Sequence, residues 1–162
     1  MTYALGAVGT LAVIALAYFG MLKGWRHRQQ RQADLAELPA VPDITDQGVE
    51  GVYIATTTAG DWMDRIAVQE LGVRSVADLA VTDAGLLFRR RGAADLFIPA
   101  DRVTEVRTDR GIAGKVTPES SGLVVVTWQH DGRDLDTGFR PRRKADIATL
   151  TSSISTLIGA DR

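Results

Sequence analysis

Residues 123–140 read LVVVTWQHDGRDLDTGFR and carry the clearest structural pattern in the chain. Asp131-Gly132 forms a two-residue hairpin turn, because glycine readily adopts the positive φ that such turns require. Pairing then proceeds outward from His130 opposite Arg133. One face of the hairpin is mostly apolar: Val124, Val126, Trp128, Leu135, Thr137 and Phe139. The other face is polar: Thr127, Gln129, Asp134 and Asp136. Since a slip of one residue would bury the two aspartates, the pattern predicts both the hairpin and its register.

Five shorter runs upstream also have the composition or alternation of strands, and turn signals separate them. They span residues 51–58, 75–82, 86–90, 95–98 and 103–108. Pro99 ends the fourth run, and residues 61–73 fit neither the strand period nor the helix period. Together with the hairpin, these runs predict about seven antiparallel strands.

The end of the chain has a different period. Apolar residues recur there at helical spacing: Ile147, Leu150, Ile154, Leu157 and Ile158. Pro141 suits the first turn of a helix, and Gly159 suits its C-terminal cap. Strands followed by one amphipathic helix favour a mainly β domain, in which about seven antiparallel strands form a small barrel capped by the C-terminal helix. We expect this domain to span residues 51–162.

The first part of the chain has another composition. Residues 3–22 are uncharged and mostly apolar, and as a helix they would span about 30 Å, the thickness of a bilayer core. A cleaved signal peptide would carry its basic residues before the apolar run, whereas here they follow it. A buried core helix would need partners on all sides. Of the three interpretations we favour a transmembrane anchor over residues 1–25.

The flanks of this run predict how it would lie in a bilayer. Four residues after it suit a membrane interface: Lys23, Trp25, Arg26 and Arg28. Because no basic side chain precedes the run, the positive-inside rule predicts an N-terminus outside and a C-terminal domain in the cytoplasm, at the inner membrane. The small residues Gly6, Gly9 and Thr10 could let two such helices associate, which would make the protein a homo-oligomer.

Residues 26–50 join the two parts. They begin with a basic stop sequence and continue as an acidic segment in which Pro39 and Pro42 break any helix. Because the segment offers little to bury, we expect it to be a linker that tethers the domain.

Composition excludes several kinds of chemistry. The 162 residues include no cysteine, so disulfides, thiolate metal sites and thiol nucleophiles are ruled out. Residues 111–115 have neither the spacing nor the following helix of a phosphate-binding loop. Asp131, Asp134 and Asp136 do not form a calcium loop, and His130 has no acidic partner that would make it a base. We expect no metal, no cofactor, no nucleic-acid ligand and no enzymatic activity.

Charge is distributed unevenly. Residues 1–32 carry four basic and no acidic side chains, whereas residues 33–162 carry fifteen basic and twenty acidic ones. Cations in the acidic part cluster at two places: Arg89, Arg90 and Arg91, and Arg142, Arg143 and Lys144. Cations oppose the dipole at the start of a helix, so the second cluster needs another explanation. We treat both clusters as candidate contacts for acidic lipid headgroups or an acidic partner, beside the simpler interpretation of a solvated surface.

Several runs resemble a known family. They are Ala59-Gly60-Asp61-Trp62, Leu71-Gly72-Val73-Arg74-Ser75, Arg110-Gly111-Ile112-Ala113-Gly114-Lys115 and Asp136-Thr137-Gly138-Phe139-Arg140. In addition, residues 85–107 look like the central strands of bacterial PH-like domains. The chain is similar to a family of actinobacterial single-pass membrane proteins with one anchor and one PH-like domain. The resemblance implies a fold and a location, and it supplies no catalytic residue.

Together these observations predict a bitopic inner-membrane protein. Its cytoplasmic PH-like domain would bind or scaffold a partner protein or anionic lipid at the membrane surface. The alternative is an accessory subunit of a transport or export system, because similar proteins are also labelled transporters. One helix cannot form a transport path alone, so that role would require further subunits.

Overall fold

The computed structural model describes residues 13–24, 35–109, 111–112, 115–116 and 122–160. The chain divides into two compact units, Met1–Asp34 and Leu35–Arg162. In the first unit, residues 13–24 form a helix whose side chains are exposed. Within the part of the chain that the structure describes, no helix is both long enough and apolar enough to span a membrane.

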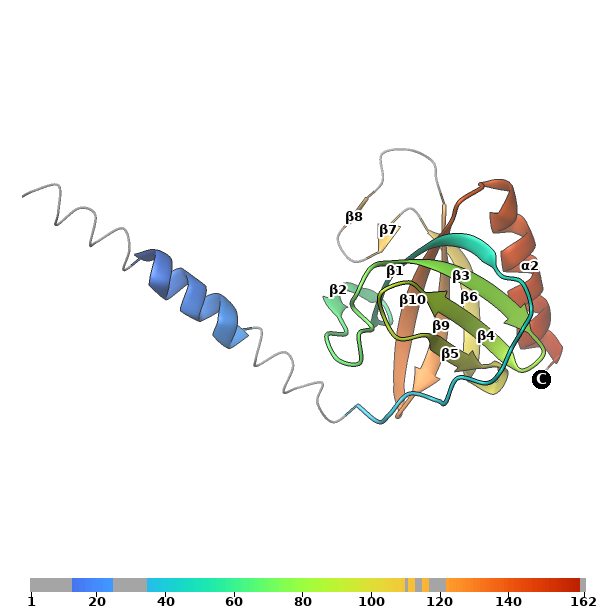
Figure 1. The fold of residues 1–162 in the computed structure, drawn as a ribbon, viewed down its shortest axis with the longest axis horizontal. Coiled ribbons are helices and arrows are strands. Elements are labelled where there is room, and N and C mark those ends of the chain that lie inside the picture. The colour runs from blue at the N-terminus through green and yellow to red at the C-terminus, as the bar shows by residue number, and fades with distance from the viewer. Residues whose placement is uncertain (1–12, 25–34, 110, 113–114, 117–121, 161–162) are drawn as a thin grey trace, which may run out of the picture. The chain divides into compact units, whose positions relative to one another are not determined.

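The second unit is a mainly β domain with an antiparallel sheet and a C-terminal helix (Figure 1). Its elements are β1 (Val49–Thr58), β2 (Asp61–Arg65), β3 (Ser75–Thr82), β4 (Gly85–Arg90), β5 (Leu96–Pro99), the 3-10 turn η1 (Ala100–Arg102), β6 (Val103–Asp109), β7 (Gly111–Ile112), β8 (Lys115–Val116), β9 (Leu123–His130), β10 (Arg133–Pro141) and α2 (Ala145–Ala160). The main sheet has the order β5-β4-β3-β1-β10-β9-β6, with β2 also paired to β1. The seven strands of this order are the seven that the sequence predicts.

The β9–β10 hairpin has the predicted register, from Arg133 opposite His130 to Phe139 opposite Val124. The start of α2 differs from the prediction. Pro141 lies at the end of β10, and the Arg142 N–H still donates to the Glu50 carbonyl at 2.8 Å. Because the ladder to β1 continues as far as Arg142, the helix starts later than predicted, at Ala145, and it extends past Gly159 instead of ending there.

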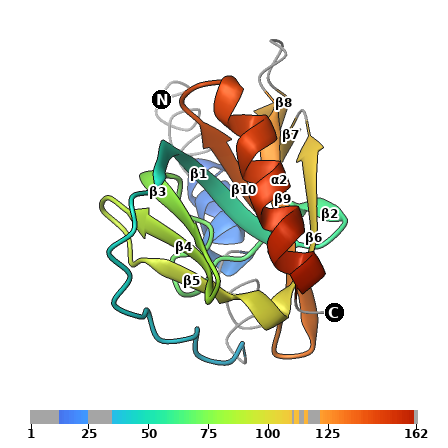
Figure 2. The same ribbon diagram turned by 90° about the vertical axis from the view of Figure 1, so that its right-hand side faces the viewer.

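The predicted barrel does not close. Strands β5 and β6 stand at opposite ends of the strand order and are not paired with each other. Strand β5 has only four residues and pairs with β4, and after the 3-10 turn η1 the chain enters β6, which pairs with β9. Helix α2 lies across the open side of the sheet (Figure 2), where Leu150 and Ile154 complete the main core as predicted.

A chain of buried hydrogen bonds crosses this core. The Trp128 indole N–H donates to Thr137 Oγ1 at 2.9 Å, and Thr137 Oγ1 lies 2.7 Å from Thr56 Oγ1. Thr56 Oγ1 lies 2.6 Å from the Tyr53 hydroxyl, which donates to the Leu71 carbonyl at 2.8 Å. Since each hydroxyl has one proton and Tyr53 uses its own on Leu71, Thr56 must donate to Tyr53 and Thr137 to Thr56. Burial raises the pKa of Tyr53 to about 12, which keeps this donor protonated.

The outer face of the hairpin is less open than the sequence indicates. Asp136 is buried, and its carboxylate accepts from Arg107 Nη2 at 2.7 Å, from Thr127 Oγ1 at 2.6 Å and from the Gly60 N–H at 3.2 Å. Arg107 reaches Asp136 from β6 across β9, so this pair ties three strands together. Burial alone would raise the pKa of Asp136, but these three hydrogen bonds outweigh burial and hold that pKa below its ordinary value.

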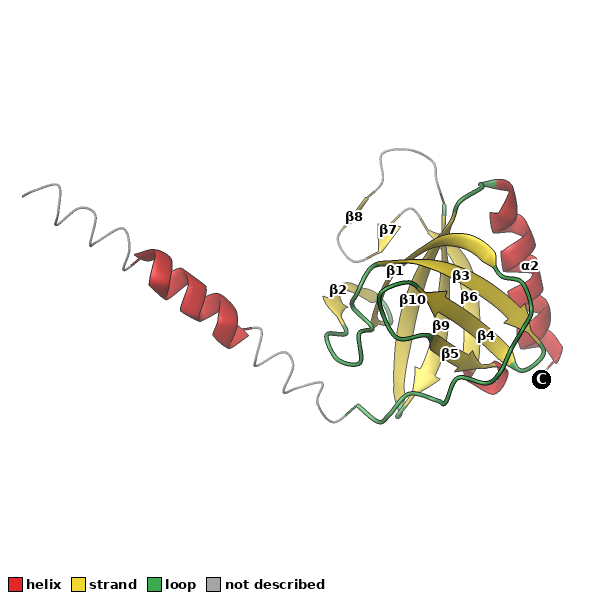
Figure 3. Cartoon of the chain, viewed as in Figure 1, coloured by secondary structure: helices red, strands yellow, loops and turns green. Residues whose placement is uncertain are grey.

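Residues 35–48, here called the strap, pack against the domain although the sequence analysis assigns them to the linker (Figure 3). Leu35 enters the main core, and Ile44 packs on a second apolar cluster formed by β3, β4 and β5. The Gln69 side-chain amide accepts from the Leu38 N–H at 3.1 Å and donates to the carbonyls of residues 35 and 36. Arg89 donates to the carbonyls of Ile44 and Asp46. The folded unit therefore begins at Leu35.

Replacement of Thr137 by valine tests the buried hydrogen-bond chain. Valine keeps the shape of threonine but leaves the Trp128 N–H without its acceptor and Thr56 without its donor, so we expect a loss of about 3 kcal/mol in the free energy of unfolding. Thr137→Ser, which keeps the hydroxyl and loses one methyl group, should cost about 1 kcal/mol. Urea denaturation of the full chain in mild detergent measures both values. Equal losses in the two variants would contradict the assigned role of the hydroxyl.

The lowered pKa of Asp136 predicts an acid-dependent contribution to stability. The carboxylate stabilises the fold fully above the pKa of an unfolded-chain aspartate, about 4, and this stabilisation is lost as pH falls through the lower pKa of the folded state. Asp136→Asn should therefore cost roughly 2 kcal/mol at about pH 7 and progressively less as the pH is lowered below about 4. Urea denaturation of both chains at about pH 7 and again below about pH 4 measures how the cost of the substitution changes. A cost that stays constant with pH would show that the carboxylate charge contributes nothing.

Candidate functional site

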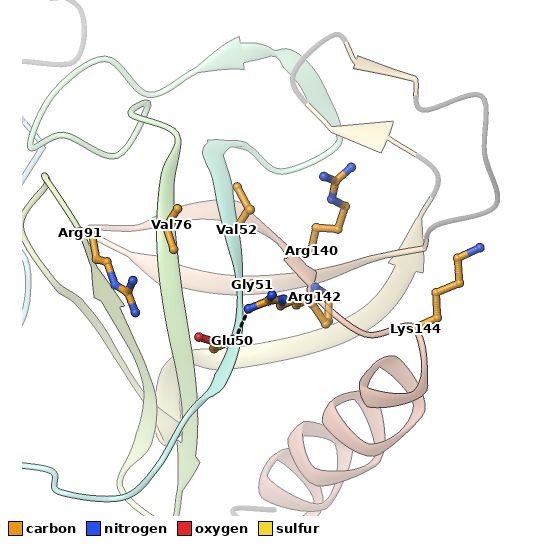
Figure 4. A pocket seen from close by; sticks show the side chains of 9 residues that line it. Glu50, Gly51, Val52, Val76, Arg91, Arg140, Arg142 and Lys144 are labelled. Carbon is orange, nitrogen blue, oxygen red and sulfur yellow. Dashed lines mark hydrogen bonds and ion pairs between the residues drawn. The ribbon is translucent and has the colours of Figure 1, made fainter.

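The candidate site lies on the outer face of the sheet, where β1, β3 and β10 meet at one end (Figure 4). Val52 lies opposite Arg140 on one side and opposite Val76 on the other, so these three side chains form one row. Side chains of directly paired residues share a face of the sheet, and all three point to the same side in Figure 4. The Arg91 N–H donates to the Val76 carbonyl at 2.9 Å, which places Arg91 next to this row.

A cavity of about 530 Å³ opens over this row. Four cations border it, Arg91, Arg140, Arg142 and Lys144, together with one carboxylate, Glu50. Its apolar floor is formed by the two valines of the row, and the Val76 side chain is half exposed. We call this cavity the basic pocket.

Two ion pairs hold the rim of the basic pocket. Arg142 Nη1 lies 2.9 Å from Glu50 Oε2, and Arg91 Nη2 lies 3.8 Å from Asp78 Oδ2. Both arginine side chains are largely exposed, at 75% and 68%. Ion pairs this exposed contribute little to stability, typically about 0–1 kcal/mol. An incoming anion could therefore exchange partners with them at small cost.

Of the six predicted contact cations, Arg91, Arg142 and Lys144 line the basic pocket and three do not. Arg89 holds the strap through the carbonyls of Ile44 and Asp46. Arg143 pairs with Asp146 in the first turn of α2, with Nε 3.0 Å from Oδ2. This contact compensates the unfavourable position of a cation at the start of a helix.

Arg90 is removed from the candidate contacts because it is buried. Only 6% of the residue is exposed, and its guanidinium lies 4.6 Å from the centre of the Tyr53 ring. It also donates to the carbonyls of Glu70 and Ala94. A cation held in this way stabilises the fold, and it is not available to a ligand.

The residues predicted to lie at the membrane mostly fall outside the described part of the chain. Lys23 lies near the end of the helix over residues 13–24 and is exposed. The remaining interface residues, Trp25, Arg26 and Arg28, and the small-residue patch, Gly6, Gly9 and Thr10, are not among the described residues.

Other side chains considered for chemistry have structural contacts. His130 is buried against Trp128, its Nδ1 lies 3.1 Å from Arg102 Nη1, and its Nε2 lies 2.9 Å from the Ala36 carbonyl oxygen. Because Arg102 can only donate, Nδ1 accepts and Nε2 donates, so His130 fastens the strap. No cluster of metal-ligating side chains occurs among the described residues.

Sequence reasoning missed six residues that line the basic pocket, among them Arg140, Val52 and Val76. A signal for Arg140 was present, because the predicted hairpin alternation places it on the same face as Asp134 and Asp136. The two valines had no such signal, since their position depends on how β1 pairs with β3 and β10. Those pairings join residues far apart in the sequence.

The fold has recognisable relatives. A solved structure called "The 8S snRNP Assembly Intermediate" contains a chain that is 10% identical, with a TM-score of 0.50 over 75% of this chain and 89% of that chain. At this identity the likeness shows the fold alone. No curated protein matches the chain. The family described as "Bacterial PH domain-like" matches residues 32–155, which is well over half of the chain. The chain thus belongs to the bacterial PH domain-like family.

Proposed function

We propose that this protein is a single-pass protein of the inner membrane whose cytoplasmic PH-like domain is a binding module. The domain holds an anionic group of a lipid or a partner protein in the basic pocket, without a catalytic step. The observation that carries the proposal is the gathering of Arg91, Arg140, Arg142 and Lys144 around one open cavity. In a domain with more acidic than basic side chains, such a gathering is not a consequence of overall composition.

Exposed apolar side chains support the membrane part of the proposal. In the helix over residues 13–24, large side chains such as Leu16 and Phe19 are 72% and 67% exposed. They belong to the uncharged run 3–22. Burial of apolar surface is worth about 25 cal/mol per Å², so a helix with this surface favours a lipid environment over water.

The membrane part predicts how C-terminal fusions behave. The full chain should stay in the membrane fraction after alkaline carbonate extraction. Alkaline phosphatase fused to the C-terminus should be inactive, because the four basic residues after the run keep the domain in the cytoplasm. A fluorescent protein at the same position should be bright. Release by carbonate would refute the anchor, and an active phosphatase would refute the orientation.

The binding part predicts that pocket cations set the affinity for soluble anions. The full chain, held in nanodiscs of phosphatidylcholine, is titrated with a fluorescent glutamate-rich peptide and separately with short-chain phosphatidylglycerol. At least one should bind, and less tightly as salt is added. Arg140→Gln combined with Arg142→Gln should weaken binding at least about tenfold, since each surface cation contributes about 1 kcal/mol.

Arg74→Gln is the matched control for this titration. Arg74 is an exposed cation that does not line the basic pocket, so its loss changes the net charge without changing the site. Binding should be almost unchanged in this variant. If neither anion binds, or if the double variant binds like the parent chain, the domain is not the anion-binding module proposed.

A further inference from the structure

A second hollow begins where the basic pocket ends. It has a volume of about 710 Å³ and lies between the end of β6, at Thr108, and one side of α2, from Ile147 to Ser155. Lys144 lines both this hollow and the basic pocket. In Figure 4 it stands between the end of β10 and the start of α2. The two cavities therefore adjoin at Lys144, and we call them together the track.

We infer that the ligand of the track is an acidic, extended segment of a partner protein. This inference rests on the proposed function, because it specifies which anion the domain binds. Acidic side chains of the segment lie among the cations of the basic pocket, and its apolar side chains contact Val52 and Val76. The chain then passes Lys144 and continues along α2.

The length of the track fits a peptide. From Ala145 to Ser155 the helix axis rises about 15 Å. An extended chain covers this distance with about five residues. A single lipid headgroup would fill the basic pocket and leave the second hollow unused.

The lining of the second hollow also fits a peptide. It is rich in hydroxyl groups, with Thr108, Thr151, Ser152 and Ser155. Three of these residues, Thr108, Ser152 and Ser155, are exposed, so a ligand can reach their hydroxyl groups. A peptide backbone offers both donors and acceptors to such groups, whereas a lipid acyl chain offers none. The hydroxyl lining therefore favours a protein segment over a lipid tail.

Overall charge disfavours a lipid surface. Residues 33–162 carry five more acidic than basic side chains, and Glu50 lies in the basic pocket itself. Salt screens charges beyond a Debye length of about 8 Å for both kinds of ligand. A flat anionic bilayer comes within that distance of a wider part of the acidic domain surface than a short segment does. The local excess of cations therefore suits a narrow anionic ligand.

The test uses the full chain in phosphatidylcholine nanodiscs and three probes. These are a fluorescent peptide of alternating glutamate and valine, its glutamine–valine counterpart, and short-chain phosphatidylglycerol. The glutamate–valine peptide should bind most tightly, and Arg142→Gln should weaken it several-fold. Ser152→Trp, which fills the second hollow from an exposed position, should weaken it about tenfold, whereas Ser153→Trp, on the same helix outside the hollow, should have little effect.

Each outcome bears on one part of the inference. If phosphatidylglycerol binds in an Arg142-dependent manner and the peptide does not, the partner-protein inference is overturned while the anion-binding function stands. If Ser152→Trp leaves peptide binding unchanged, the second hollow is not part of the track. Equal binding of the glutamate and glutamine peptides would show that the bound segment need not be acidic. If no probe depends on Arg142, the proposed function itself fails.

Discussion

The buried hydrogen-bond chain from Trp128 to Leu71 is the constraint on which the arrangement of the sheet depends. It needs Tyr53 and Thr56 on the same inner face of β1, although residues three apart in a regular strand face opposite sides. A bulge between Tyr53 and Ala55 resolves this conflict, because it adds one residue to β1 relative to β10. On the N-terminal side of the bulge, Val52 faces outward beside Arg140. The same irregularity that completes the core therefore aligns the floor of the basic pocket with its cations.

Local patterns in the sequence predicted the local parts of this fold. The β9–β10 register followed from one turn and one alternation, because a slip would have changed the face of every side chain. The bulge in β1 had no such signal, since it compensates contacts made with β10 and with the loop at Leu71. The open barrel and the packed strap were missed for the same reason: both depend on contacts between distant segments. Ile44, for example, packs on strands that follow it by some forty residues.

Charge patterns predicted the candidate site in part. Arg142 and Lys144 stood out because cations oppose the dipole of a helix that follows them, and both line the basic pocket. Arg143 had the same signal, but Asp146 accounts for it. Arg90 is buried for a reason that composition cannot reveal: its guanidinium lies over the Tyr53 ring, and its Nε and Nη1 donate to two carbonyl groups. A run of cations thus separates into structural and ligand-facing members only when the partners of each side chain are known.

Because the strap is packed on the domain, a membrane anchor would be joined to the domain by a shorter connection than the sequence analysis expects. With residues 35–48 packed on the sheet, only residues 25–34 connect the helix over residues 13–24 to the folded unit. Ten residues reach at most about 35 Å, whereas the linker of residues 26–50 expected from the sequence could reach more than twice as far. If the helix over residues 13–24 lies in a membrane as proposed, this shorter connection would raise the effective concentration of the domain near the bilayer and keep any bound partner close to it. His130, Gln69 and Arg89, which fasten the strap, would then control how far from the membrane the basic pocket can act.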